Sequence, residues 1–325
     1  MLLLILGARE ALASEVSVWI DTDAACDGSA HHDPDDCFAI LHLLRMPGVV
    51  VEGISTTFGN SERETADEVL RQLLGADPVA AAVPAWSGAL EPGDCETEGT
   101  AALRAALRDT PRLQILALGP LTNVACALRT SPAAARTAAK VIAVMGARPG
   151  HVFHPAEERS RDALLGHGPV FTDLNLEKDP MAAKLLLDAG VPLVLVPYEA
   201  ARRREIGREE LSALAVRAPA TTFVSLRARS WLDFWIATTG RDGFYPFDLV
   251  AAAYLSGAIP FECVLERVEV APDRAIGFFG GPLRLLLLGS RRDDRRPQAE
   301  VCHPAGAPGR IHVDELFPRD ANDAG

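Results

Sequence analysis

An apolar run that ends abruptly in acidic residues constrains the fold of this chain most. Residues 16–20 have the pattern of a buried strand, Asp21 and Asp23 follow at its end, and Asp35 and Asp36 open a helical pattern. Carboxylates gathered at one strand end repel each other strongly unless a cation lies between them. A hard divalent ion, Ca²⁺ or Mg²⁺, fits better than zinc because no cysteine–histidine set accompanies the acids. The alternative is an acidic helix N-terminus followed by a solvated loop.

Strand-like and helix-like segments alternate along the rest of the chain. We expect strands over residues 49–57, 113–118, 140–145 and 191–196, and helices over 62–74, 121–128, 180–189 and 248–255. Ser61 is expected to cap the first of these helices, and Gly190 to end the third. The order predicts an α/β fold with a mainly parallel central sheet, a Rossmann-like core and helices on both faces. Ligands in such sheets bind outside the carboxyl ends of the strands, where Asp21, Asp23, Asn60, Leu118 and Met145 fall.

Composition excludes two classes of partner. The chain has 325 residues and a formal net charge of −12, so it lacks the basic stripe that binding to nucleic acid requires. No run approaches the length of a membrane-spanning helix, and we expect no membrane partner. The six cysteines are scattered and form no C-x-x-C motif, so they predict neither a zinc site nor a dense disulfide framework.

The first residues have an ambiguous pattern. Residues 1–13 are apolar at first and close with an A-x-A pattern before Ser14, but no positive residues precede the apolar run, and Arg9 and Glu10 interrupt it. We expect a cytoplasmic protein, with export as the alternative if this segment is a leader. Residues 1–14 are thus a possible leader and 15–325 a single domain. Its irregular segments near 146–169 and 200–245 could be flaps over the site or helical insertions.

Five blocks of sequence together resemble the inosine–uridine-preferring nucleoside hydrolase family. They are residues 21–23 with 35–36, 53–60, 117–123, 144–146, and the pair 173–175 with 247–251. The resemblance implies a nucleoside-hydrolase-like fold, Ca²⁺ as cofactor and a small-molecule nucleoside as substrate, cleaved to free base and ribose. It also implies a homodimer or homotetramer. An N-glycosidic bond breaks through an oxocarbenium-like transition state, which an anionic site stabilises.

The resemblance implies a set of metal ligands. Asp23 resembles the ligand that is also the general base toward a metal-bound water, and Asp36 resembles a bidentate ligand. Leu118 matches the position whose backbone carbonyl binds the ion, and Asp248 matches the last carboxylate ligand. Asp21 matches a residue that orients the metal loop. On local grounds alone, Asp248 could instead be a helix cap.

Further positions match groups that contact the substrate, namely Asp35, Asn60, Asp173 and Asn175 on the sugar. On local grounds Asn60 could be a turn residue, and Asn123 is interpreted as a helix cap. Met145 lies on the pocket floor or in the core.

The loop between the two acid pairs is longer than the family pattern. It spans residues 24–34, and either Asp27 or Asp33 could match the acid that precedes Asp35. His31 and His32 lie in this loop, where they could donate a proton to the leaving base or simply be solvated.

Other departures concern the base and the sugar. Phe247 stands where family members that accept purines and pyrimidines often carry a histidine. An aromatic residue there resembles the purine-preferring branch, and Trp86 could supply the second face of a stack on the base. Both aromatics could instead be core residues. Asp173 replaces the usual glutamate, and His167 stands where a sugar-contacting asparagine is expected.

Two other functions stay open. The chain could be a nucleoside- or sugar-binding relative without catalytic activity, in which Phe247 and Asp173 mark a lost reaction. It could also be a phosphatase-like enzyme that uses Asp21 of the D-x-D motif as nucleophile, although that reading leaves Asn60 and the Gly119 block unexplained.

Overall fold

A central sheet of eight strands organises the chain. The computed structural model describes residues 15–78, 80–129, 140–148, 172–272, 285–287 and 297–318. The strands lie in the order β3-β2-β1-β4-β5-β6-β12-β9, and every neighbouring pair is parallel except β12 and β9. Their bounds are β1 Val16–Thr22, β2 Val49–Thr56, β3 Ala85–Trp86, β4 Gln114–Ala117, β5 Val141–Ala143, β6 Leu193–Leu195, β9 Phe261–Arg267 and β12 Gln298–Pro304. The predicted α/β fold with a mainly parallel sheet is confirmed.

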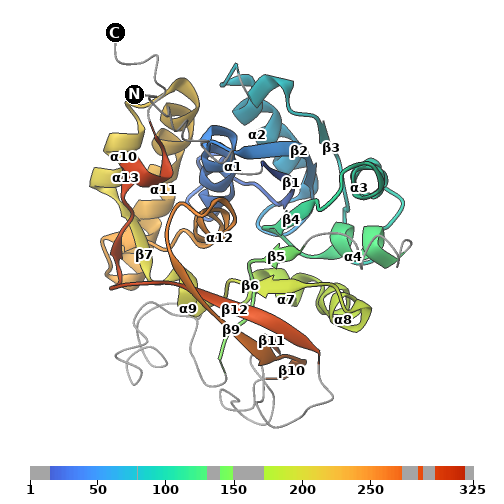
Figure 1. The fold of residues 1–325 in the computed structure, drawn as a ribbon. Helices are drawn as coiled ribbons and strands as arrows, with labels where there is room; N and C mark the ends of the chain where they lie inside the picture. Colours follow the sequence, from blue (N-terminus) through green and yellow to red (C-terminus); the bar gives the residue numbers. More distant parts are fainter. Residues whose placement is uncertain are drawn as a thin grey trace, which may run out of the picture.

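Helices cover both faces of this sheet (Figure 1). One face packs against α1 (Asp35–Arg45), α2 (Arg63–Gly75) and α12 (Phe247–Ser256), and the other against α3 (Glu98–Asp109), α4 (Thr122–Arg129) and α8 (Pro180–Ala189). Helix α11 (Pro219–Thr239) packs outside the first layer, against α1 and α2. Along β1, Val18 and Ile20 join the first apolar cluster and Trp19 joins the second. This alternation is what a strand buried on both faces requires, because successive side chains point to opposite faces.

Shorter elements complete the described chain. They are η1 (Ala80–Ala82), α7 (Leu174–Lys178), α9 (Tyr198–Ala201), α10 (Arg208–Leu214), α13 (Val313–Leu316), β7 (Arg204–Gly207), β8 (Gly243–Phe244), β13 (Gly309–Arg310), and the antiparallel pair β10 (Val270–Pro272) and β11 (Leu285–Leu287). The segment 200–245 is therefore mainly helical, and its role as a flap or an insertion stays a prediction. Most of the predicted flap at 146–169, and the possible leader, lie outside the described residues.

The predicted elements agree with the observed ones to within a few residues, and the two predicted helix ends differ in outcome. Gly190 has a φ of +66° and ends α8, as expected. Ser61 does not cap α2, because Glu62 occupies the N-cap position and the Ser61 hydroxyl donates to the Glu62 carbonyl. Of the described helices, none combines the length and the apolar character needed to cross a bilayer.

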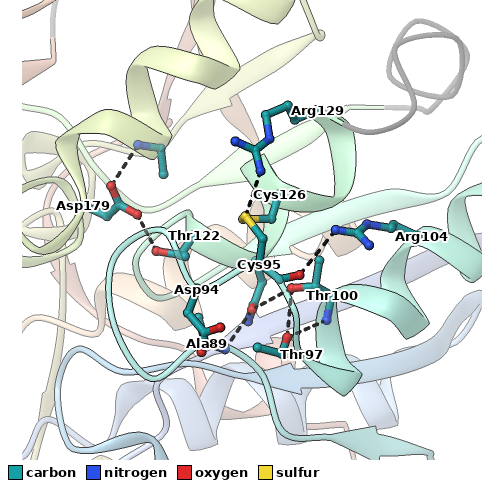
Figure 2. Close-up of a disulfide and its surroundings, with 12 residues drawn as sticks. Ala89, Asp94, Cys95, Thr97, Thr100, Arg104, Thr122, Cys126, Arg129 and Asp179 are labelled. Carbon is teal, nitrogen blue, oxygen red and sulfur yellow. Dashed lines mark hydrogen bonds between the residues drawn. A yellow bond between two sulfur atoms is a disulfide. The ribbon is translucent and has the colours of Figure 1, made fainter.

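All six cysteines are paired, which corrects the expectation of no disulfide framework. The pairs are Cys26–Cys37, Cys95–Cys126 and Cys263–Cys302. Figure 2 shows the second pair, which joins the segment before α3 to α4. Two guanidinium groups lie against it: Arg104 donates to the Cys95 carbonyl and Arg129 to the Cys95 sulfur. Scattered spacing could not predict these pairs, because tertiary folding brings distant cysteines together.

Candidate active site

The carboxyl ends of four parallel strands open into one cavity of about 330 Å³. Asp23 follows β1, Leu118 follows β4, Met145 follows β5 and Tyr198 follows β6, and all four line this cavity. The topology thus places the cavity where parallel α/β sheets bind ligands.

Carboxylates gather in one cluster on the cavity wall. Asp23, Asp35, Asp36 and Asp248 all line it, and each is at most 4% exposed. Oxygens of Asp35, Asp36 and Asp248 lie within 4.8 Å of one another. The backbone N–H of Asp248 donates to Asp35 Oδ2 at 2.8 Å, which joins the start of α12 to the start of α1. The acidic cluster predicted near the start of the chain and the distant Asp248 therefore lie together in the structure.

Burial and mutual repulsion set the ionisation of this cluster. Burial raises the pKa of Asp35 to about 7, and the charge of Asp36 adds to the rise. Burial, followed by neighbouring carboxylates, raises the pKa of Asp23 and of Asp248 well above the ordinary value. Such a set holds its charge only if a cation compensates it, and an all-oxygen donor set suits a hard ion such as Ca²⁺. The residues present therefore fit a divalent ion.

Two glycines shape the space that Asp23 occupies. A Cβ at Gly59 would lie 2.0 Å from Asp23 Oδ2, and one at Gly119 would lie 3.0 Å from Asp23 Cγ. The backbone N–H of Asn60 donates to Asp23 Oδ2 at 2.7 Å. The glycines of the 53–60 and 117–123 blocks thus admit the Asp23 carboxylate, and the first block also orients it.

Asp21 supports the site from behind. It is fully buried, it is not among the cavity-lining residues, and its Oδ1 accepts from Ser55 Oγ at 2.5 Å and from Asn123 Nδ2 at 2.8 Å. Burial raises the pKa of Asp21 to about 7. This position suits a residue that orients the loop and argues against Asp21 as a phosphatase nucleophile. The interpretation of Asn123 as a helix cap is wrong. Its side chain also forms hydrogen bonds with the backbone of Thr56 and Ala89, so it joins three segments of the chain.

The predicted sugar-binding residues lie on the cavity wall, but several are engaged by the protein. Asn175 Nδ2 donates to the carbonyls of Leu118 (2.5 Å) and Val144 (2.9 Å), so it fixes the predicted metal-ligand carbonyl. Asp173 caps α7 through Leu176 N–H and accepts from Gly146 N–H at 2.6 Å.

The remaining positions divide between the wall and its surroundings. Asn60 lines the cavity, with its side chain bonded to the backbone of Asp33. Met145 is buried, lines the cavity and belongs to the second apolar cluster, so both of its interpretations hold. His167 lies outside the described residues.

Aromatic side chains form a wall of the cavity. Phe247 lines it and stacks on Tyr198 with ring centroids 6.2 Å apart, as part of a wall completed by Trp231, Phe234 and Trp235 of α11. Sequence reasoning missed the α11 residues, although their i, i+3, i+4 spacing marks one helix face. Trp86 is elsewhere. It lies on edge strand β3 and stacks on Trp19 with centroids 5.2 Å apart, so its predicted contact with the base is wrong. It completes the packing of the second core instead.

The long loop contributes two of its residues to the cavity. Asp33 lines it, and its Oδ1 accepts from Asp35 N–H, whereas Asp27 pairs with His32 at 3.0 Å. Asp33 is therefore the acid beside the 35–36 pair. His31 also lines the cavity, and it lies edge-on to Phe234 with ring centroids 4.8 Å apart.

Known proteins resemble this chain over most of its length. The family model described as inosine-uridine preferring nucleoside hydrolase matches residues 18–304. A pyrimidine-specific ribonucleoside hydrolase RihA of Citrobacter koseri is 26% identical over 237 residues, which cover 62% of this chain and 68% of the relative. A solved plant nucleoside hydrolase, the PpNRh1 enzyme, superposes with a TM-score of 0.69 at 19% identity and covers 90% of this chain and 94% of its own. A purine-preferring ribonucleoside hydrolase from Gardnerella vaginalis gives 0.67 at 19% identity, with 92% and 96% covered.

Proposed function

Because the chain belongs to the inosine–uridine-preferring nucleoside hydrolase family and is a hydrolase acting on N-glycosyl bonds, we propose that it cleaves ribonucleosides with the help of bound Ca²⁺. The observation that carries this proposal is the cluster of buried carboxylates that lines the cavity, with Asp248 brought to Asp35 from far along the chain. The proposed ligands are the carboxylates of Asp23, Asp36 and Asp248 and the carbonyl of Leu118. Bound there, Ca²⁺ would lower the pKa of a water molecule and orient the sugar diol.

The protein's own groups supply the remaining chemistry. Asp23, oriented by the N–H of Asn60, accepts the proton of the attacking water. Asp35 accepts hydrogen bonds from the ribose hydroxyls. The negative charge of the cluster stabilises the oxocarbenium character that develops on the sugar. Asn175 and Asp173 hold the strand ends that frame the sugar through the contacts described above.

The aromatic wall of the cavity is the proposed nucleobase subsite. Stacking of a base on an aromatic side chain contributes on the order of 1–3 kcal/mol, and the larger face of a purine covers more of the wall of Tyr198, Trp231 and Phe247. We therefore place purine nucleosides first. The names of the relatives point both ways, since RihA is called pyrimidine-specific and the Gardnerella enzyme purine-preferring.

The disulfides bear on where the enzyme works. Every cysteine is paired, and disulfides persist in oxidising compartments and are rare in the reducing cytosol. We favour export over the cytoplasmic location expected from the first residues. Thiol titration of the denatured protein isolated without reductant tests this: no free thiol supports export, and six free thiols refute it. A homodimer or homotetramer stays a prediction, to be tested by light scattering.

One assay tests the proposed reaction. Purified protein is incubated with inosine, guanosine, adenosine, uridine and cytidine, and released ribose is measured as reducing sugar with Ca²⁺ or with chelator. We expect release with Ca²⁺, strong loss with chelator, and a ~10²- to 10⁴-fold lower kcat in Asp23→Asn. Nucleoside binding by calorimetry without any ribose release would identify a binding protein instead of an enzyme.

A further inference from the structure

We propose that His31, carried by the long loop of residues 24–34, donates the proton that the leaving nucleobase requires. This inference rests on the proposed function and adds to it a catalytic residue from the loop that departs from the family pattern. The carrying observation is the position of the imidazole, which lines the cavity against Phe234 of the aromatic wall.

The aromatic wall fixes which part of a substrate His31 meets. The carboxylates are the proposed sites of the sugar and the cation, and the aromatic wall is the proposed site of the base. Phe234, Trp231 and Trp235 of that wall come from one face of α11. Their rings pack on one another, with centroids of Trp231 and Phe234 5.6 Å apart. Because His31 packs edge-on against Phe234, its ring lies beside the proposed site of the base.

The loop is built to hold His31 in place. Its start is tied to α1 by the Cys26–Cys37 disulfide. Before His31, Asp27 accepts from Ser29 N–H at 2.8 Å, and Ser29 Oγ accepts from His31 N–H at 3.2 Å. After it, the Asp33 backbone forms two hydrogen bonds with the Asn60 side chain. Both flanks of His31 are thus fixed, while its own ring bonds none of these groups.

The neighbouring histidine has a different task. His32 Nδ1 lies 3.0 Å from Asp27 Oδ2, so its ring is paired within the loop and is not among the cavity-lining residues. Within the part of the lining that the structure describes, His31 is the one imidazole. The ionisable groups around it are Asp27, His32 and Asp33 of its own loop, Arg227 of α11 beside Gly28, Tyr198 on the wall, and the carboxylate cluster.

The chemistry needs a proton donor beside the base. When the bond between C1′ and the base nitrogen breaks, its electron pair stays on the base. The base is a poor leaving group unless a proton neutralises the charge that develops on it. In the proposed step, the imidazolium of His31 gives its proton to a ring nitrogen or carbonyl oxygen of the base. Water adds its hydroxyl to C1′ and its proton to Asp23. Proton exchange with solvent then restores both side chains, so the net reaction consumes one water molecule.

A pair of variants and a pair of substrates test this role. His31→Gln is compared with the matched control His32→Gln, on inosine and on 4-nitrophenyl β-ribofuranoside, whose leaving group departs without protonation. We expect His31→Gln to lower kcat on inosine by ~10²- to 10⁴-fold and on the nitrophenyl riboside by less than about threefold. His32→Gln should stay within about threefold of wild type on both substrates.

Three outcomes would overturn the inference. Equal activity of His31→Gln and wild type on inosine excludes His31 as donor. Equal loss on both substrates assigns it to structure alone, and Ca²⁺ affinity and thermal unfolding of the variant then show what it supports. If the wild type releases ribose from neither substrate, the proposed function is refuted, and the inference about His31 is refuted with it. Wild-type activity with an unaffected His31→Gln refutes only the present inference.

Discussion

The Cys26–Cys37 disulfide should contribute to cation binding, whereas the Cys263–Cys302 disulfide should not. It closes the loop that separates Asp23 from Asp36, and Cys37 directly follows Asp36. Replacing both cysteines by alanine removes the link without adding a polar group to a buried position. The control is the Cys263–Cys302 pair, which joins β9 to β12 at the far edge of the sheet.

The two pairs differ in the size of the loop they close. For the sequence separation of 11 in Cys26–Cys37, loop-closure entropy gives ~3 kcal/mol of stabilisation, and for the separation of 39 in Cys263–Cys302 it gives ~4 kcal/mol. The control should therefore lose at least as much free energy of unfolding. Only Cys26→Ala/Cys37→Ala should lose Ca²⁺ affinity, by roughly tenfold or more. A tenfold loss corresponds to the entropy cost of fixing the backbone of about one additional residue when the ion binds.

Urea unfolding followed by tryptophan fluorescence gives the free energies, and calorimetric titration with Ca²⁺ gives the affinities. Unchanged Ca²⁺ affinity in Cys26→Ala/Cys37→Ala would refute the reasoning, because the loop would then keep its shape without the link. Equal loss of affinity in both double variants would also refute it, because the effect would then follow overall stability.

Three further predictions concern the cradle of Asp23, a buried histidine and the cation. Gly59→Ala places a Cβ 2.0 Å from Asp23 Oδ2 and should lower kcat at least ~100-fold. The control Gly75→Ala adds a Cβ that meets nothing within 4 Å, so it should leave kcat unchanged. Equal rates of the two variants in steady-state assays would contradict the proposal that Gly59 makes room for the Asp23 carboxylate. Burial lowers the pKa of His42 from 6.5 to about 4, so the unfolded chain binds a proton that the folded chain excludes, and stability should fall by ~3 kcal/mol as pH drops from 6.5 to 4. Urea unfolding across this range should show that slope in wild type and a flatter one in His42→Gln. Since the carboxylate pKa values are raised, Ca²⁺ must displace protons at low pH, and its increase of Tm should be larger at pH 8 than at pH 5; an equal increase would indicate a different binding site.

Local sequence patterns were sufficient for most of the fold. Strong apolar periodicity in β1, β2 and α8 specified their type, because burial on a sheet or helix face leaves a repeat in the sequence. Helix boundaries were less accurate: Ser61 is a good capping residue, yet Glu62 takes the N-cap position. Asn123 illustrates the same limit, because its partners Asp21, Thr56 and Ala89 come from segments that only tertiary structure brings near.

Some residues of the candidate site could likewise be predicted from the sequence, and others could not. Asp23, Asp35 and Asp36 were predictable because acidic residues at strand and helix ends are conspicuous, and the cavity gathers them. Asp248 looks locally like a helix cap, and only the resemblance to the family linked it to the cluster. The α11 aromatics were not predictable, since an aromatic helix face facing a cavity has the same pattern as one facing the core. Trp86 failed for the converse reason: its neighbour Trp19 provides an apolar partner that its own segment does not reveal.

The distance along the chain between the halves of the carboxylate cluster has a consequence for biosynthesis. Asp35 and Asp248 are 213 residues apart, so a nascent chain cannot assemble the cluster until α12 has left the ribosome. Contacts of such long range form late in folding, because closing the intervening chain costs entropy first. Tight cation binding would therefore begin only when the whole sheet has formed. The ion would then stabilise completely folded molecules and not partly folded ones.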